Sequence, residues 1–425
     1  MKRRILPWLL AGSLMLTLPG CGAGGAVLAG KSPVMPESAS SAVEADERLT
    51  AVLAEFSAES GEALLLGQEN LCYAPVSLYY ALALAGTGAA GETQQEIYAL
   101  LGCSDAETLS DDLETLYRAL YRDEKHCKVY LANSVWMREG VAFYEGYTDN
   151  AAKRFYAECY TMNFDAPKAG RTISDWVSDK TKGLLKPEVT LKPETIAVLL
   201  NAVYFKANWI DEFQKKYTEQ AAFTRADGSD VLCDFMQDGR SGRAVAAEGY
   251  CLAAIPFDGG FEMFFLLPDE GESIDGLVMS RDLAELLDES AAEYRMVEWR
   301  VPKFTVQSQL DLVPVLRKLG VEQAFSDTAA DFSAMCDVQQ LGGPAYIGAV
   351  EQGVSFSIDE EGAEAAAYTE IAVGAGSPAP PEEAIQSRRS RAAAAEVEAL
   401  PDAGATVQRE AKFARATILR RGKYG

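Results

Sequence analysis

Histidine is almost absent from this chain: its 425 residues include only His126. A Ser–His or Cys–His catalytic centre needs a histidine held by partner groups, and His126 lies between charged residues and an apolar run with no recognisable partner. The sequence also lacks a phosphate-binding glycine loop and a cluster of metal-ligating residues. We therefore expect no enzymatic activity, no metal site and no cofactor, and we place His126 on the surface.

Paired cysteines are absent too. The chain has eight cysteines, scattered and without a CxxC pair, and setting Cys21 aside leaves an odd number that makes no regular disulfide set. We interpret most of these as small buried hydrophobic side chains. They are Cys72, Cys103, Cys127, Cys159, Cys233, Cys251 and Cys336.

Positive charge is scarce, with 39 Lys and Arg against 63 Asp and Glu and a net charge of −24. Nucleic-acid binding needs a basic face, so the composition argues against that class of function. An acidic surface favours solubility and is repelled by anionic lipid. With 48% hydrophobic residues, the chain can still bury a sizeable core.

The first residues have the pattern of a secretory signal, with basic residues at 2–4 and an apolar stretch at 5–18. Residues 18–21 read Leu-Pro-Gly-Cys and resemble a bacterial lipobox, in which Cys21 becomes lipidated and forms the new N-terminus. The alternative is an ordinary signal peptide that is cut nearby.

We accordingly assign 1–21 to the signal peptide and lipobox, and 22–45 to a flexible tether rich in Gly, Ala, Ser and Pro. A diacylated Cys21 would supply the two acyl chains that stable anchoring needs. The sequence thus predicts an extracellular lipoprotein held at the cell surface through its N-terminal lipid.

The hydrophobic pattern predicts helices early in the chain and strands late, without a strand–helix repeat or an internal linker between 46 and 376. This distribution is typical of one α+β domain with a largely antiparallel sheet. The run 197–205 is apolar almost throughout, which indicates a strand buried on both faces. Other expected elements are helices at 46–58, 77–85 and 312–319 and strands at 129–136, 263–267, 297–301 and 354–358.

The most informative stretch is 359–369, where acidic residues are followed by Gly362 and a run of small side chains. A glycine between a strand and an alanine run permits a bend, and small side chains can later fit between packed strands. The stretch resembles the hinge of the reactive-centre loop of serpins. Its residues are Glu360, Glu361, Gly362, Ala363, Glu364, Ala365, Ala366 and Ala367.

Six further segments resemble serpin motifs in the family's order, so that the resemblance covers about 46–373. The closest match is 201–209, Asn-Ala-Val-Tyr-Phe-Lys-Ala-Asn-Trp. In the family its tryptophan packs where the loop first enters the central sheet, and the resemblance therefore assigns Asn201 and Trp209 to this region. The other segments are 70–77 with 88–93, 132–136, 173–183, 301–304 and 330–335.

The resemblance implies a serpin fold for residues 46–377, with three β-sheets, about nine helices, an exposed reactive-centre loop and a monomeric state. Serpins are one-use inhibitors of serine proteases. The protease attacks the loop and forms an acyl-enzyme, and the cut loop then inserts into the central sheet, which distorts the protease before deacylation. Tyr368 is larger than the residue that serpins usually carry there, which favours the alternative of a non-inhibitory serpin acting as a binding or adhesion module.

Counting from Gly362 with the usual family spacing places the scissile bond at Gly376–Ser377, with Ala375 or Val373 as the alternative primary residue. Small residues around the bond suit a serine protease with a shallow primary pocket, such as an elastase-like or subtilisin-like enzyme. Trypsin-like targets do not fit, because no basic residue follows the hinge before Arg388.

Residues 378–425 depart from the family and form an atypical tail that lacks the usual apolar terminal strands. Nine Lys and Arg against six Asp and Glu give 377–425 a charge of +3, so that 1–376 carry −27 of the total of −24. This reversal favours a reading-frame shift, which would make the chain an inactive product. The alternative is a genuine disordered extension.

Overall fold

The computed structural model describes residues 28–29, 31, 33, 45–65, 70–225, 229–376 and 420–421. Within these ranges the chain forms nine α-helices and two hydrogen-bonded sheets. The helices are α1 (Glu47–Leu65), α2 (Pro75–Gly86), α3 (Gly91–Leu100), α4 (Ala106–Leu120), α5 (Glu145–Arg154), α6 (Ala169–Lys180), α7 (Ile274–Ser280), α8 (Leu283–Leu286) and α9 (Val313–Lys318), and short 3₁₀ turns lie at Lys215–Tyr217, Gln323–Phe325 and Val338–Leu341.

Most strands of the described residues come after α4; they alternate with α5 and α6 and then largely follow one another. They are β1 (Leu28–Ala29), β2 (Arg122–Asp123), β3 (Cys127–Arg138), β4 (Ala157–Met162), β5 (Thr195–Asn208), β6 (Glu219–Thr224), β7 (Asp230–Ala247), β8 (Tyr250–Phe257), β9 (Phe261–Pro268), β10 (Glu293–Pro302), β11 (Phe304–Asp311), β12 (Ala345–Ile358), β13 (Gly362–Ala375) and β14 (Arg420–Arg421).

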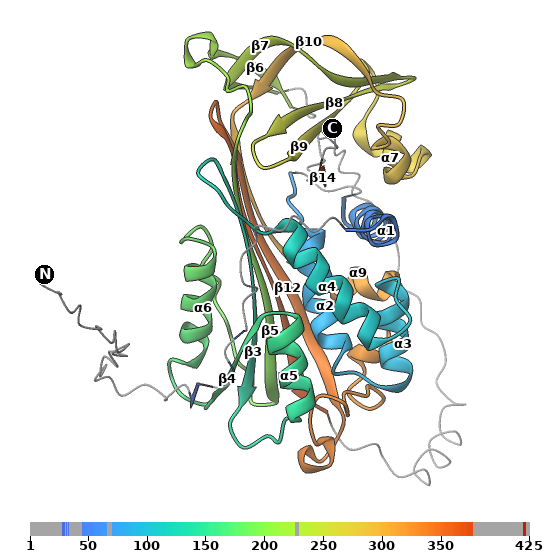
Figure 1. Cartoon of the computed structure of the whole chain (residues 1–425), viewed down its shortest axis with the longest axis vertical. Helices are drawn as coiled ribbons and strands as arrows, with labels where there is room; N and C mark the ends of the chain where they lie inside the picture. The colour runs from blue at the N-terminus through green and yellow to red at the C-terminus, as the bar shows by residue number, and fades with distance from the viewer. Residues whose placement is uncertain are drawn as a thin grey trace, which may run out of the picture.

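The central sheet has eight strands in the order β1-β4-β3-β5-β13-β12-β11, with β2 beside β3. Among the described strands only the β3–β4 pair is parallel. The sheet is therefore largely antiparallel, as predicted. β5 is buried on both faces because its residues from Thr195 to Ala202 are almost all apolar. The long strands β5, β13 and β12 run side by side along the body of the molecule (Figure 1).

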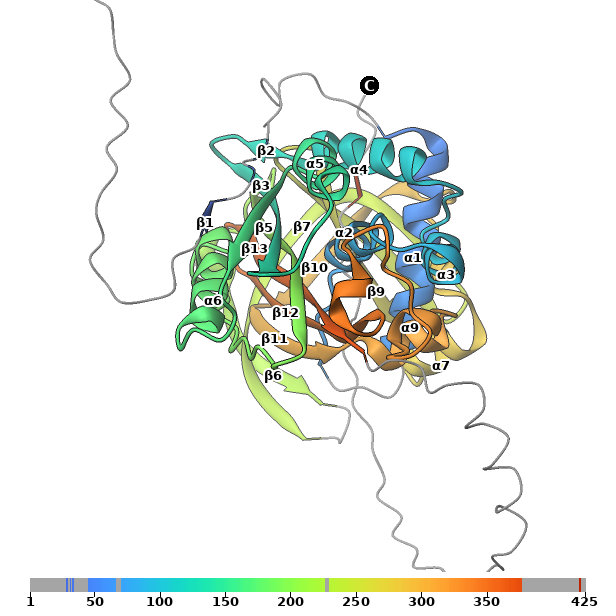
Figure 2. The same ribbon diagram turned by 90° about the horizontal axis from the view of Figure 1, so that it is seen from below.

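Helices cover both faces of this sheet. α6 lies alone across one face, while α1 to α5 and α9 gather on the other (Figures 1 and 2). α2 begins at Pro75, which suits the first turn of a helix. It forms the centre of the second layer, since it is buried from Ser77 onward. The main apolar core therefore lies between α2 and the sheet, and a smaller apolar cluster lies under α6.

The second sheet contains β10, β7, β8, β9 and β14 in that order, with β6 on β7. Three sheets were expected in the whole fold, and the described strands form two. The reason is the length of β7, an 18-residue strand that pairs with β6 and β10 through its first part and with β8 through Ala244–Ala247. β14 is the part of the predicted tail 378–425 that the structure describes, and it pairs with β9.

The segment predicted to be an exposed reactive-centre loop is instead strand β13 in the middle of the central sheet. It pairs antiparallel with β5 along one edge and with β12 along the other. An extended segment of small residues satisfies its backbone groups on both sides in this position, which an exposed loop leaves to water. The prediction of an exposed loop therefore does not describe this conformation.

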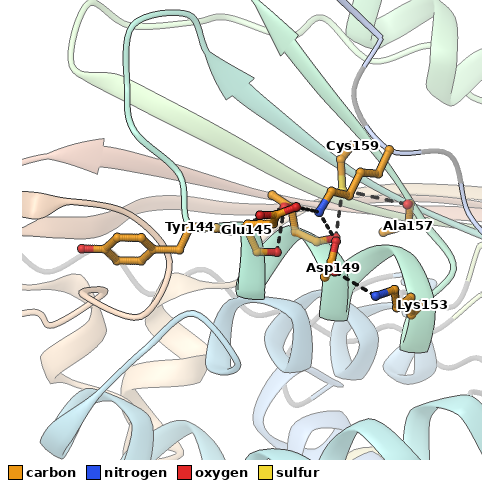
Figure 3. A network of polar contacts seen from close by, with 8 residues as sticks. Tyr144, Glu145, Asp149, Lys153, Ala157 and Cys159 are labelled. Atoms are coloured by element: carbon orange, nitrogen blue, oxygen red, sulfur yellow. Dashed lines mark hydrogen bonds and ion pairs between the residues drawn. The ribbon is translucent and has the colours of Figure 1, made fainter.

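A short N-terminal segment lies against the edge of the central sheet. β1 pairs with β4, the Lys31 carbonyl accepts a hydrogen bond from the Cys159 amide at 3.1 Å, and the Lys31 ammonium forms ion pairs with Glu145 (3.5 Å) and Asp149 of α5. Figure 3 shows the two carboxylates on α5 facing this contact. The described residues 28, 29 and 31 of the predicted tether 22–45 are thus held by the domain.

Most elements expected from the sequence are present. The predicted helix 77–85 and strand 197–205 are confirmed by α2 and β5, and the helix predicted at 46–58 continues to Leu65. In the described parts of the chain, no helix has both the length and the apolar character needed to cross a bilayer.

The seven described cysteines are all unpaired, and three of them, Cys127, Cys159 and Cys336, are buried. Burial raises the pKa of the Cys159 thiol to about 12, so it stays protonated. For these three the interpretation as small buried hydrophobic side chains is confirmed.

Candidate functional site

A tight turn joins β12 to β13 at the predicted hinge. Asp359 Oδ1 accepts hydrogen bonds from the amides of Glu361 (2.8 Å) and Gly362 (3.2 Å), and the Asp359 amide donates to the Gly362 carbonyl at 3.0 Å. Gly362 is required for closeness rather than for an unusual backbone angle, because a Cβ atom there would lie 2.0 Å from the Ala207 carbonyl oxygen. The hinge glycine thus lets the inserted strand begin directly against β5.

Trp209 holds this turn from the side. Its indole Nε1 donates to the Asp359 carbonyl at 2.9 Å, and its amide donates to the Glu361 carbonyl at 3.0 Å. The ring stacks on Phe257 with centroids 4.1 Å apart and is 1% exposed. The structure therefore places Trp209 at the end of the sheet where the inserted strand starts, as the resemblance implied.

Glu360 anchors the same turn with a buried carboxylate. Lys303 Nζ donates to Oε2 and Thr218 Oγ1 donates to Oε1, both at 2.8 Å. Burial raises the pKa of the Glu360 carboxyl, but the hydrogen bonds from Lys303 and Thr218 outweigh burial, and the pKa lies below its ordinary value. The neighbouring Glu361 is exposed and pairs with Lys215 at 2.8 Å.

The small residues that follow divide between the two faces of the sheet. Ala363 packs in the main core and Ala366 and Ala367 are also buried, while Ala365 is partly buried against the core. Glu364 lies on the face that carries α6, where Tyr204 Oη donates to its carboxylate at 2.6 Å. Larger side chains at the buried alanines would overpack the sheet against its neighbours.

The middle of the inserted strand is held by buried polar groups that sequence reasoning did not assign to the site. The Thr369 hydroxyl lies 2.8 Å from the Ser77 hydroxyl of α2, and Gln352 Nε2 donates to it at 2.8 Å. Gln352 also exchanges hydrogen bonds with the backbone of Ala74 at 2.8 and 3.0 Å. The sequence feature that could have indicated this contact is Ser77, which lies in the matched motif 70–77.

Asn201 belongs to this middle region. It lies opposite Thr369 in the register of β5 and β13, and its amide donates to Asn133 of β3 at 2.9 Å. The end of the sheet where the strand enters is marked by Asn208, which pairs with Gly362. This corrects the prediction that grouped Asn201 with Trp209 at the point of entry.

The predicted scissile residue lies at the opposite end of the sheet from Trp209. The Gly376 amide donates to the Pro344 carbonyl at 2.6 Å, and a Cβ atom there would lie 2.0 Å from the Asp327 carbonyl oxygen. Gly376 therefore lies a full strand length away from the turn at Gly362. Ser377 and the predicted lipidation site Cys21 lie outside the described residues.

The single histidine lies on the surface, as predicted. His126 is exposed and lines an open hollow of about 530 Å³ together with Trp209, Asp238, Arg240 and Asp258. The described part of the chain contains no group of three His, Cys, Asp or Glu side chains that could hold a metal ion.

The fold described above agrees with the comparison of this chain with known protein families. Residues 51–389 match the family model described as serpin, serine protease inhibitor. The chain belongs to the serpin family. Homologues in this family inhibit serine proteases, with loop insertion as their typical mechanism, although some serpins are non-inhibitory.

The relatives are widely distributed. Serpin-Z2A of Oryza sativa subsp. japonica is 31% identical over 347 residues, covering 71% of this chain and 82% of the relative. Serpin I2 of Homo sapiens is 28% identical over 326 residues, covering 73% of this chain and 78% of the relative.

Two solved serpin structures are similar to this chain over most of its length. Tengpin, a thermophilic serpin in the latent state, has a TM-score of 0.72 at 26% identity, with 77% of this chain and 90% of that chain covered. Cleaved Serpin 42Da has a TM-score of 0.70 at 25% identity, with 79% and 92% covered.

Replacement of Lys303 by methionine should destabilise this serpin. It leaves the Glu360 carboxylate, whose side chain is 6% exposed, with one of its two side-chain donors. Loss of a hydrogen bond to a buried charged group costs about 1–3 kcal/mol, measurable by denaturant unfolding. Lys215→Met is the matched control, because it breaks the exposed pair with Glu361 and should change stability little. Equal effects of the two substitutions would contradict the role given to the buried pair.

The inserted strand should also depend on pH. Glu370 of β13 lies directly opposite Glu351 of β12, which in turn lies opposite Asp311 of β11. Burial, and then the charge of Glu351, raise the pKa of the Glu370 carboxyl from 4.5 to about 7. Between these values the inserted form holds a proton that a solvated glutamate has lost, so its stability falls as the pH rises through this window.

Thermal unfolding of the inserted form from pH 4.5 to 8 measures this effect. The inserted form should be more stable at the acidic end, by on the order of 1–3 kcal/mol. Glu370→Gln cannot ionise and should flatten the profile over this range, whereas Glu361→Gln, at an exposed position of the turn, should keep it. An unchanged slope in Glu370→Gln would show that other groups carry the pH dependence.

Proposed function

We propose that this serpin inhibits a serine protease with a shallow primary pocket, elastase-like or subtilisin-like, and that cleavage falls at Gly376–Ser377 or within the preceding residues. The protease acylates the chain at this bond, and insertion of β13 carries the acyl-enzyme from the Trp209 end of the sheet toward the opposite end. The monomeric chain is consumed in one cycle.

The observation that carries this proposal is the pairing of β13 with β5 and β12 along almost its whole length. The register with β5 is continuous from Gly362, opposite Asn208, to Val373, opposite Ala197, and after one register shift Gly374 lies opposite Thr195. A segment that fits the sheet over this length has the property that trapping by insertion requires. The residues beside the proposed bond, Val373, Gly374 and Ala375, are all small enough for a shallow pocket.

Trapping is tested by mixing the chain from residue 22 onward with pancreatic elastase and with subtilisin. We expect a covalent complex that survives boiling in SDS, together with a released peptide whose mass locates the cleaved bond. Clean cleavage without a complex would mean that the serpin is a substrate and would favour the non-inhibitory alternative.

Two variants of β13 separate insertion from simple cleavage. Ala367→Glu puts a carboxylate at a buried position between Val203 and Val354, so this variant should be cleaved without trapping the protease. Ala372→Ser adds one hydroxyl at a partly buried position of the same strand and should trap as the parent does. Equal trapping by both variants would exclude insertion of β13 as the trapping step.

We further propose that the serpin acts at the cell surface, held by lipid on Cys21. The proposal is supported by the Leu-Pro-Gly-Cys pattern after an apolar stretch. Cys21→Ser should abolish labelling by radioactive fatty acid, while leaving protease inhibition intact. Undiminished fatty-acid labelling of Cys21→Ser would contradict lipid anchoring through Cys21.

A further inference from the structure

Tyr368 is the one large side chain within the run of small residues at the start of β13, and the sheet provides a matching space. Its neighbours across the strands are Gly353 of β12 on one side and Ala202 of β5 on the other. Beyond these lie Gln309 of β11 and Ala132 of β3 in the same row. The phenol ring therefore lies in a row whose adjacent positions are both small.

Gly353 leaves the space that the ring occupies. A Cβ atom on Gly353 would lie 2.3 Å from Tyr368 Cε1, closer than such atoms approach in proteins, and 3.0 Å from Cζ. Glycine inside a strand is otherwise unfavourable and often marks a close approach of another group. Here the group is the ring of Tyr368, which is 3% exposed.

Gln309 completes the space by binding the phenol hydroxyl. Gln309 Nε2 lies 2.9 Å and Oε1 lies 3.1 Å from Tyr368 Oη. Tyr368 also belongs to the apolar cluster under α6, which includes Leu200 and Trp176. A buried tyrosine needs such a partner, because an unpaired hydroxyl is costly inside the protein.

We infer that Gly353 and Gln309 form a receiving site for Tyr368, and that occupation of this site determines whether insertion of the cleaved loop runs to completion. The inference rests on the proposed inhibitory function and adds two positioning residues to it. The four alanines that precede Tyr368, at 363, 365, 366 and 367, are small and do not by themselves fix a register. Tyr368 fits in only one register, because a shift of two residues along β12 would place its ring against Glu351 or Ser355.

This site couples the rate of insertion to the fate of the acyl-enzyme. If Tyr368 is delayed, insertion stops after the alanines, and hydrolysis of the acyl-enzyme releases an active protease. The bulk of Tyr368 is then compatible with inhibition only in a sheet that carries glycine at 353.

The test is a double-mutant cycle on the full-length protein, with Gly353→Ala, Tyr368→Ala and both together. Gly353→Ala should slow insertion about tenfold, raising the number of serpin molecules consumed per trapped elastase or subtilisin, and should lower the melting temperature of the cleaved form by roughly 2–6 °C. Adding Tyr368→Ala should restore both values to those of Tyr368→Ala alone. Gln309→Leu should give a smaller loss that Tyr368→Phe removes.

Gly348→Ala is the matched control on the same strand, because a Cβ atom there would lie 3.7 Å from its nearest neighbour, an ordinary contact. Two results would overturn the receiving site: Gly353→Ala behaving like Gly348→Ala, or Gly353→Ala remaining impaired when Tyr368→Ala is added. If the parent traps no protease but the melting temperatures of the cleaved forms still show the coupling, the receiving site stands and the proposed inhibition fails.

Discussion

The hydrogen bonding of one segment to two strands at once is the constraint on which the rest of this structure depends. β13 can lie between β5 and β12 only if every side chain from Gly362 to Ala375 fits a sheet that is covered by α6 on one face and by the main core on the other. The alanines meet this demand by being small. The same pairing satisfies the backbone groups of the segment along both edges, which favours the inserted state.

Three positions require more than smallness. At the start, Gly362 lies against the Ala207 carbonyl and Glu360 fixes the turn through Lys303. In the middle, Thr369 joins β13 to Ser77 and Gln352 through buried hydrogen bonds. Between them, Tyr368 occupies the space left by Gly353. A strand made only of small residues would lack these contacts and could pair in several registers. The specific contacts fix one register, and that register places the proposed scissile residue Gly376 at the far end of the sheet.

The sequence predicted the elements well where the pattern is local. The apolar run 197–205 and the helix after Pro75 have strong periodic signals, and both lie where they were expected. The position of β13 could not be predicted in this way, because the local pattern of a segment of small residues is the same in an exposed loop and in a central strand. The role of Gln352 depends on contact with Ala74 and Thr369, which are far apart in the chain, and the sheet count depends on how far β7 continues.

The central claim is that the segment 362–375 moves from solvent into the sheet when the loop is cut. Hydrogen–deuterium exchange of the peptide spanning 362–375, compared in freshly refolded intact protein and in protein cleaved near Gly376, tests this directly. Insertion predicts that the amides of this segment exchange rapidly before cleavage and as slowly as those of β5 after it. Rapid exchange of the segment in the cleaved protein would contradict the mechanism.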